Sequence, residues 1–456
     1  MPVTGSTISN AADAFSVLLE RVNSNVKFLF DQTPSKVLGL FKSGNKTVKI
    51  NDRFYRCPYV KWQGGTHQYY NPEGTTYGSG SGMQTKHLTG GYFNTSYAIS
   101  FTEKLEDSTQ EIGGQTTLNF VSTQVARAMD EVMLIDEITL FTDGSGILTS
   151  ASTATGSSGG GTTYTFGSAT DGIGITRLRT GMTVVAYANT STPRANGTNP
   201  GFPAVITNLD VDNNVVYLDS AITGAAAADF LVFAGTGTNA GLLTLPAQTG
   251  QSTWPLSGDS ARHGIPYANA TTGYFLGVDR TTNLELKATT VNVSPNIYTP
   301  FYTLQIRDKL IAKRDEAAIQ GIIGIIHMNV RAQYYQVQSA ITGILQTRQV
   351  ENTKDLIPSG VQYETELPIG GIMHYICKRQ SKDRADYVIP GNWERAALND
   401  QGWLKNEGGG YLWQVRSSTG GAAPRKEGYF LQKHDYVCLD PGAGAFINGI
   451  QISTGY

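Results

Sequence analysis

Charged residues, cysteines and long apolar runs are all scarce in this chain of 456 residues. Asp, Glu, Lys and Arg together make up 16%, and 35 basic against 37 acidic residues leave a net charge of -2. Tight capture of nucleic acid or of an anionic membrane needs an excess of positive charge, so both are disfavoured, and any contact with DNA should be weak. No stretch reaches the roughly 18 apolar residues of a membrane span, and the N-terminus lacks the pattern of a signal peptide.

The three cysteines are Cys57, Cys377 and Cys438. They are odd in number and far apart, which argues against both a disulfide framework and a zinc site. We expect free, buried thiols in a protein that is made and kept in a reducing cytoplasm.

Catalytic motifs are also missing. The six histidines are scattered, none at the i, i+4 spacing of a zinc helix, and there is no nucleophile elbow, Walker loop or dinucleotide fingerprint. Two acidic pairs, Asp130 with Glu131 and Asp136 with Glu137, are predicted to lie on a salt-bridged or solvated helix face. The sequence therefore disfavours an enzyme, and we assign no catalytic, cofactor-binding or metal-binding residue and no cofactor.

What is abundant is glycine, with 52 residues, accompanied by Thr, Ser, Asn and Tyr in alternating apolar runs. This composition predicts a chain rich in strands and loops, and its length favours two or three lobes. Helical periodicity is clear over Ala11–Val22, over Thr117–Phe141 and, less regularly, over "SPNIYTPFYTLQIRDKLIAKRD". In the last segment Leu304, Ile306, Leu310 and Ile311 are expected to face a core.

The second helix has its apolar stripe at Leu118, Val121, Val125, Met129 and Val132 and leads into the loop Asp143–Gly146. A calcium loop needs several carboxylates, and a phosphate loop should follow a strand and be followed by a lysine. Neither pattern is present. We interpret the loop as a helix stop in which Gly144 allows a left-handed cap.

Two aromatic runs, "DRFYRCPYVKW" and "GYFNTSYAISFTEKL", flank a glycine-rich segment between the first two helices. They predict two strands joined by a long flexible tip. Such a hairpin is marginal in water by itself, so it either projects and covers a partner surface or lies flat on its own domain. The pattern leaves both open.

A Gly/Ser/Thr-rich bridge then leads to strands "GMTVVAY", "FPAVITNLDVDNNVVYLD" and "ADFLVFAG", with a hairpin turn at Asp212–Asn214. We predict an inserted antiparallel module whose own core contains Val184, Tyr187, Val205, Ile206, Val215, Tyr217, Val232 and Phe233. Because a separate core makes a module dispensable, we expect a chain with residues 165–250 replaced by a linker to remain foldable.

Downstream, "GIIGIIHMNVRAQYYQV" predicts a buried strand followed by a helix from about Asn329, and "LPIGGIMHYICK" predicts a second buried strand. The charges from Arg379 to Asp386 are expected in a solvated loop, with a subunit contact as the alternative.

The order of these elements carries a resemblance. A helical arm, a long hairpin, an acidic helix ending in "DEITLFTDGSGIL", an inserted strand module, "GIPYANATTGYFLGVDRTTNLELKATTVNV" and a lobe ending in "LPIGGIMHYICKRQSKDRADYVIPGNW" resemble the major capsid proteins of tailed double-stranded-DNA bacteriophages. Their shell fold is named after phage Hong Kong 97.

The resemblance implies an α+β fold in seven segments. These are an N-terminal arm over residues 1–45, an extended hairpin loop over 46–110, a peripheral domain with a spine helix over 111–160, an inserted small β-barrel or sandwich over 161–255, a further peripheral segment over 256–300, an axial α/β domain over 301–385, and a return to the peripheral domain over 386–456. In this family the hairpin lies over a neighbouring subunit.

The implied function is that of a major capsid protein, which self-assembles through hexamers and pentamers into the icosahedral head around phage DNA. The implied partners are copies of itself, scaffolding, portal and decoration proteins, and packaged DNA in weak non-specific contact. The implied location is the virion, after assembly in the host cytoplasm. An encapsulin-type nanocompartment shell is the alternative on the same fold, and a phage fibre or adhesin-like protein is the alternative of a different class.

Overall fold

The computed structural model describes residues 36–43, 47–49, 54–64, 84–93, 97–103, 133–143, 146–155, 160–166, 172–189, 192–196, 199–200, 203–233, 264–276, 278–294, 296–346, 366–403, 412–416 and 422–453. The predicted helix over Ala11–Val22, the apolar stripe of the second helix from Leu118 to Val132, and the glycine-rich tip over 65–83 lie outside these residues. The predicted cap residue Gly144 also lies outside them.

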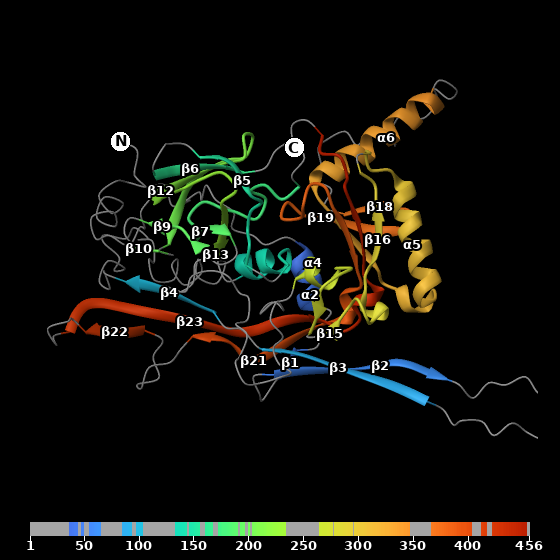
Figure 1. Ribbon diagram of the computed structural model, residues 1–456, viewed down its shortest axis with the longest axis horizontal. Coiled ribbons are helices and arrows are strands. Elements are labelled where there is room, and N and C mark those ends of the chain that lie inside the picture. Colours follow the sequence, from blue (N-terminus) through green and yellow to red (C-terminus); the bar gives the residue numbers. More distant parts are fainter. Residues whose placement is uncertain are drawn as a thin grey trace, which may run out of the picture.

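Three regions are arranged along the long axis of the molecule (Figure 1). A strand-rich region that contains β5 to β13 lies at one end, and an α/β lobe with α5 and α6 lies at the other. The long strands β21 and β23 run below the strand-rich region and the centre, and the hairpin of β2 and β3 runs below the α/β lobe, with its far end pointing away from the body.

The α/β lobe is built on a six-stranded sheet in the order β16-β24-β20-β17-β19-β18. Its strands are β16 Thr289–Asn292, β17 Ile323–Ile326, β18 Glu366–Ile369, β19 Ile372–Ile376, β20 Ala385–Val388 and β24 Ala445–Asn448. The helices α5 Pro300–Arg314 and α6 Met328–Gln346 and the 3-10 turn η3 Ala317–Ile319 complete it. The predicted strand-to-helix unit from residue 323 is therefore confirmed.

Two features of this lobe differ from the prediction. The run "LPIGGIMHYICK" forms two antiparallel strands instead of one, because Gly370 and Gly371 adopt φ of +58° and +79° and turn the chain. The predicted boundary at residue 386 cuts through the sheet, since β20 spans it and β24 returns to pair with β16 and β20.

Helix α5 begins after Thr299, has Pro300 at its first turn, and ends at Arg314, followed by the cap residue Asp315 with φ of +66°. Ile306 and Leu310 are buried as expected, together with Thr303. The prediction for Leu304 was wrong, because its side chain is 42% exposed. Residues 303, 306 and 310 share one helical face, and position 304 lies about 100° away from residue 303 around the axis.

A second, elongated sheet has the order β1-β21-β23-β22, and β4 also pairs with β23. Its strands are β1 Thr47–Lys49, β4 Tyr97–Glu103, β21 Trp393–Trp403, β22 Leu412–Arg416 and β23 Ala422–Cys438. The second aromatic run was predicted to belong wholly to the hairpin, but β4 leaves the hairpin and pairs with β23 from Tyr97–Gln432 to Glu103–Lys426.

The inserted region is a nine-stranded sheet whose pairs are all antiparallel. The strands are β5 Ser152–Thr155, β6 Gly160–Phe166, β7 Thr183–Asn189, β8 Thr192–Pro193, β9 Ala195–Asn196, β10 Asn199–Pro200, β11 Ala204–Asp210, β12 Val215–Thr223 and β13 Phe230–Phe233. The predicted hairpin turn is confirmed between β11 and β12. There the Asp210 carboxylate accepts hydrogen bonds from the backbone N–H groups of Asp212 and Asn213, and Asn214 adopts φ +53°.

The side-chain phase of β12 is the opposite of the predicted one. Val216 and Leu218 are buried, while Val215 is half-buried and Tyr217 is 38% exposed. Because successive side chains of a strand point to opposite faces, a shift of one residue exchanges the core set for the outer set. The other predicted core residues divide into Val184, Tyr187, Ile206 and Val232, which are buried, Val205, which is half-buried, and Phe233, whose side chain lies outside the described residues.

The core of the inserted sheet is not separate from the body. Ile138 of the helical segment 133–140 and Leu148 are fully buried in the same hydrophobic cluster as Phe166, Val184 and Leu231. Ile147 also forms an isolated antiparallel bridge with Val232. The inserted sheet and the end of the second helix therefore share one hydrophobic core.

Replacing residues 165–250 with a linker is now expected to yield aggregated protein, contrary to the expectation from the sequence. The change would expose Ile138 and Leu148, at a cost of about 1.5 to 3 kcal/mol for each side chain. It would also remove the carbonyl groups of Thr176 and Leu178, which accept hydrogen bonds from Arg379. Size-exclusion chromatography of the expressed variant measures this, and a soluble, cooperatively unfolding product would show that the two cores are independent.

The centre of the molecule joins the helical segment 133–140 to α2 Lys36–Ser43, α4 Ile265–Ala268 and the first residues of β21. Val37, Leu38 and Phe41 of α2 are buried there, and the ring of Phe41 meets that of Trp393 edge to face with centroids 5.1 Å apart. The short hairpin of β14 Tyr274–Phe275 and β15 Val278–Asp279 and the 3-10 turns η2 Leu284–Leu286, η4 Pro390–Asn392 and η5 Pro441–Ala443 connect these parts.

No helix within the described ranges combines the length and the apolar character that a membrane crossing requires.

Candidate functional site: a projecting hairpin and a buried junction

The hairpin of β2 Phe54–Gly64 and β3 Gln84–Phe93 forms a two-stranded sheet of its own. Its register runs from Phe54–Phe93 to Gly64–Gln84, with an irregularity between Val60 and Trp62. Its second strand therefore begins inside the segment predicted as a flexible tip. Among the described strands, none adds to either edge of this hairpin.

The hairpin projects away from the body along the long axis of the molecule (Figure 1). Of the two arrangements left open by the sequence, the projecting one is observed. A two-stranded ribbon buries too little surface to be stable alone in water, and its unpaired edges offer N–H and C=O groups to another chain. The hairpin is therefore a candidate surface for assembly.

The segment from Cys377 to Asp386, which connects β19 to β20, was predicted to be a solvated loop, and this was wrong. Its side chains are largely buried: Arg379 is 1% exposed, Lys382 is 7% and Asp386 is 0%. The segment lies between the inserted sheet and the α/β lobe, so the charges that the sequence shows are enclosed at a junction. One signal was available in the sequence: the charged run is short and has a buried strand directly on each side.

Asp386 is the acceptor at the centre of this junction. Its carboxylate receives hydrogen bonds from Asn269 Nδ2 at 3.0 Å, from Gln380 Nε2 at 2.7 Å and from Arg384 Nε and Nη2 at 2.8 to 3.1 Å. The Arg384 guanidinium also stacks over the Phe446 ring, 4.1 Å from its centroid. A buried carboxylate is tolerated only when it is paired and hydrogen-bonded in this way.

Arg379 ties the junction to the inserted sheet. Its Nη1 donates to the carbonyl oxygens of Thr176 at 3.1 Å and Leu178 at 2.8 Å, and the backbone N–H of Lys382 donates to Gly172 O at 2.7 Å. A side chain at Gly172 would collide with Asp383, because an added Cβ would lie 1.8 Å from its Oδ1. The junction thus fixes the chain from 172 to 178 by direct backbone contacts.

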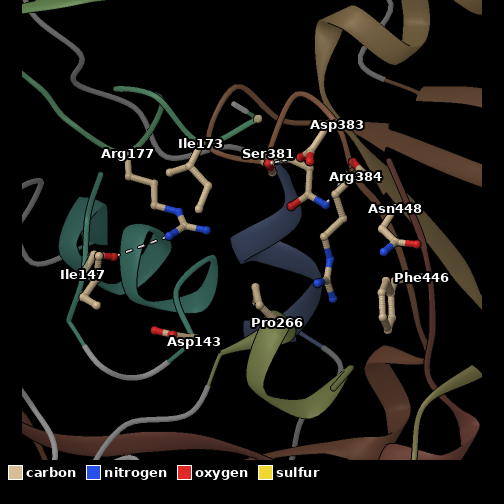
Figure 2. Close-up of a pocket in the computed structure, with 12 residues that line it drawn as sticks. Asp143, Ile147, Ile173, Arg177, Pro266, Ser381, Asp383, Arg384, Phe446 and Asn448 are labelled. Carbon is tan, nitrogen blue, oxygen red and sulfur yellow. Dashed lines mark hydrogen bonds between the residues drawn. The ribbon is translucent and has the colours of Figure 1, made fainter. Parts of the chain in front are cut away.

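A pocket of about 570 Å³ lies beside the junction (Figure 2). Arg177 and Arg384 enter it from opposite sides, Asp143 and Asp383 lie at its rim, and Arg177 Nη1 donates to Ile147 O at 3.4 Å. Because two guanidinium groups face two carboxylates, the pocket has no excess charge of either sign to select a small ion. Its lining residues are Asp143, Ile147, Gly172, Ile173, Arg177, Pro266, Gln380, Ser381, Asp383, Arg384, Phe446 and Asn448.

The loop that follows the second helix is a helix stop, as predicted. The described helix covers 133–140, Phe141 and Thr142 form a turn, Asp143 is exposed and Gly146 adopts φ +84°. Within the described part of the chain, no group of three or more His, Cys, Asp or Glu side chains could hold a metal ion.

Of the two alternatives predicted for the second acidic pair, the solvated face is wrong, because Asp136 and Glu137 are both 2% exposed. Glu137 Oε1 accepts a hydrogen bond from Cys377 Sγ at 3.6 Å. The helix end is buried on both sides, since Ile138 packs into the core of the inserted sheet and Leu140 into the central core. Asp130 and Glu131 lie outside the described residues.

The cysteine prediction is confirmed for Cys377 and Cys438, which are free and buried. Two histidines are also buried, His327 and His374. Burial lowers the pKa of His327 to about 3 and that of His374 to about 4, so both rings are neutral near pH 7.

No family model and no curated protein matches this chain. Solved structures do resemble it over most of its length. The capsid asymmetric unit of cyanophage A-1(L) is 10% identical, covers 94% of this chain and 97% of its own, and has a TM-score of 0.49. A structure from Mycobacterium phage Bobi is 7% identical with coverages of 97% and 99% and a TM-score of 0.43. The SrpI encapsulin of Synechococcus elongatus is 7% identical with coverages of 97% and 97% and a TM-score of 0.42. The solved structures to which this chain is similar thus include phage capsids and an encapsulin shell.

Proposed function

We propose that this protein is the major capsid protein of a tailed phage, and that copies of it assemble into an icosahedral shell around double-stranded DNA. The observation that carries the proposal is the projecting hairpin of β2 and β3, a two-stranded ribbon that gains stability only when another surface covers it. In a closed shell, the neighbouring copy supplies that surface, and the same contact repeats around each symmetry axis.

The proposed domain roles follow from the three observed regions. The lobe with α5 and α6 is the axial domain, and the elongated sheet with the helical segment 133–140 is the peripheral domain. The nine-stranded sheet from β5 to β13 is the inserted domain. The net charge of -2 supports loose contact with packaged DNA, because tight binding would oppose both filling and release of the genome. Scaffolding, portal and decoration proteins are the further partners in this proposal.

Shortening the hairpin tests this function. Replacing residues 56–91 with an Asn-Gly turn keeps the paired Tyr55 and Tyr92 at its base and removes the projecting part. The variant should keep the thermal unfolding transition of the body and form no shells, because the contact to the next copy is gone. Sedimentation velocity measures the assembly state. Shells formed as readily as by the unmodified chain would remove the hairpin from the assembly mechanism.

The nature of the enclosed material separates the two shell functions. Particles from infected cells that hold nuclease-protected DNA would support the phage capsid, and particles that hold a cargo enzyme and no DNA would support the encapsulin alternative.

A further inference from the structure

Four buried side chains form a continuous chain of hydrogen bonds inside the α/β lobe. Tyr298, Thr303, His374 and Tyr387 are all 0% exposed. Tyr298 OH bonds Thr303 Oγ1, which lies 2.8 Å from Tyr387 OH, which in turn lies 3.2 Å from His374 Nε2. The chain joins the start of α5 to β20 and β19, so it connects the helical cover of the lobe to two strands of its sheet.

A hydrogen bond between His374 and the backbone fixes the direction of the bonds in this chain. His374 Nδ1 lies 2.9 Å from the carbonyl oxygen of Ile372, which can only accept, so Nδ1 carries the proton. In the neutral ring Nε2 is then an acceptor, and Tyr387 must donate to it. Each hydroxyl has one proton, so Thr303 donates to Tyr387 and Tyr298 donates to Thr303. The chain therefore runs in one direction, from Tyr298 to His374.

Burial holds the ring neutral, although its polar neighbours favour the protonated form. Tyr387 of β20 faces Nε2, and the backbone of Ile372 and of Leu367 on β18 makes hydrogen bonds that favour the protonated ring. Gly324 of β17 packs against the ring. The imidazole ring is tightly packed on this side, because a Cβ added at Gly324 would lie 2.3 Å from His374 Cδ2.

The charged side chains nearest to His374 are paired with other residues. Asp386, adjacent to Tyr387 in β20, is paired with Arg384, Asn269 and Gln380 at the junction. On α5, Arg307 lies beside Gly371 at the tip of the β18–β19 hairpin and pairs with Glu316 at 3.9 Å. Burial lowers the pKa of the ring to about 4 and raises the pKa of Tyr298 to about 12 and that of Tyr387 well above its usual value, so the chain is uncharged near pH 7.

We propose that His374 is a proton-operated latch of the α/β lobe. A proton taken from solvent by Nε2 forms an N–H bond where Tyr387 now donates, so that atom changes from acceptor to donor. Tyr387 must then donate to Thr303, and Thr303 to Tyr298, which reverses the chain. The hydroxyl proton of Tyr298 has to find a new acceptor. Either this search or the buried imidazolium loosens the packing of α5 on β19 and β20.

The sign of the pH effect follows from the lowered pKa. His374 binds its proton less tightly in the folded state than in the unfolded state. Its contribution to folding stability is therefore complete above the ordinary histidine pKa of 6.5. This contribution is lost as the pH falls from about 6.5 to about 4, and it does not change further below that. His327 has the same sign, with a pKa of about 3, and its Nδ1 accepts from the backbone N–H of Asn329 at 3.1 Å at the start of α6. A test must separate the two histidines.

Hydrogen–deuterium exchange of the full-length protein between pH 7.5 and 4.5 makes that separation, after correction for the intrinsic pH dependence of exchange. In the unmodified chain, the protection of α5 amides is expected to fall by tens-fold, roughly the linkage factor for these two pKa values. In His374→Gln the fall at α5 should shrink to the smaller fall that His327 causes throughout the lobe, and in the matched control His327→Gln most of the fall at α5 should remain.

Three results would overturn the latch: constant protection in the unmodified chain, the same fall in His374→Gln, or loss of the fall in His327→Gln. If His374→Gln does not fold, ¹³C-labelled histidine in the unmodified chain gives the answer by nuclear magnetic resonance. Titration of His374 together with opening of α5 supports the latch, and opening of α5 while the His374 signal stays that of the neutral ring refutes it.

Discussion

Replacing Asp386 with leucine should destabilise the protein by about 3 to 5 kcal/mol, a large part of the roughly 5 to 15 kcal/mol by which most domains are stable. The carboxylate is completely buried and receives hydrogen bonds from three side chains, those of Asn269, Gln380 and Arg384. Leucine leaves the partly buried Arg384 guanidinium without this ion-pair partner, and the side-chain amides of Asn269 and Gln380 keep only backbone acceptors. The cost of an uncompensated buried charge exceeds the gain from added apolar surface.

Chemical denaturation followed by tryptophan fluorescence measures this effect. Asp308→Leu is the matched control, because Asp308 is exposed on α5, and a surface change of this kind costs within about 0.5 kcal/mol. The double variant Arg384→Met with Asp386→Leu should recover part of the loss, since it removes both charges together. An Asp386→Leu protein as stable as the control would show that the junction is hydrated.

Replacing Gly264 with alanine is expected to destabilise the protein by about 3 kcal/mol, the upper end of the range for overpacked cores. An added Cβ would lie 2.1 Å from Thr142 O and 2.8 Å from the carbonyl oxygens of Leu140 and Thr139. These are backbone atoms at the end of the second helix, and they cannot move aside because that helix end is held between two hydrophobic cores.

Gly391→Ala is the matched control, because nothing lies within 4 Å of its added Cβ. The melting temperature of Gly264→Ala should fall by several degrees or more relative to this control. Equal melting temperatures would mean that the segment before α4 does not pack on the helix end as described.

Local patterns were predicted best, and contacts between distant segments were predicted least. The β11–β12 turn, the strand-to-helix unit at Ile323 and the end of the second helix follow from turn chemistry and periodicity, which depend on neighbouring residues. The separation of β4 from the hairpin could not be predicted, because the alternating pattern of Tyr97–Glu103 suits any antiparallel partner.

The buried junction was missed for a related reason. A run such as Arg379–Asp386 reads as solvated when only its own sequence is considered, since charged side chains are seldom buried. Its burial depends on hydrogen-bond partners far away in the chain: the carbonyl groups of Thr176 and Leu178, which accept, and the side-chain amide of Asn269, which donates. Those partners come together only when the inserted sheet and the lobe are both in place.

Electron microscopy of the purified full-length protein tests the central claim most directly. The account predicts closed icosahedral shells, or pentamers and hexamers under conditions that disfavour closure, with the hairpin of β2 and β3 resolved against a neighbouring copy. A monodisperse monomer at high protein concentration and across a range of salt, with the hairpin folded back on its own body, would contradict it.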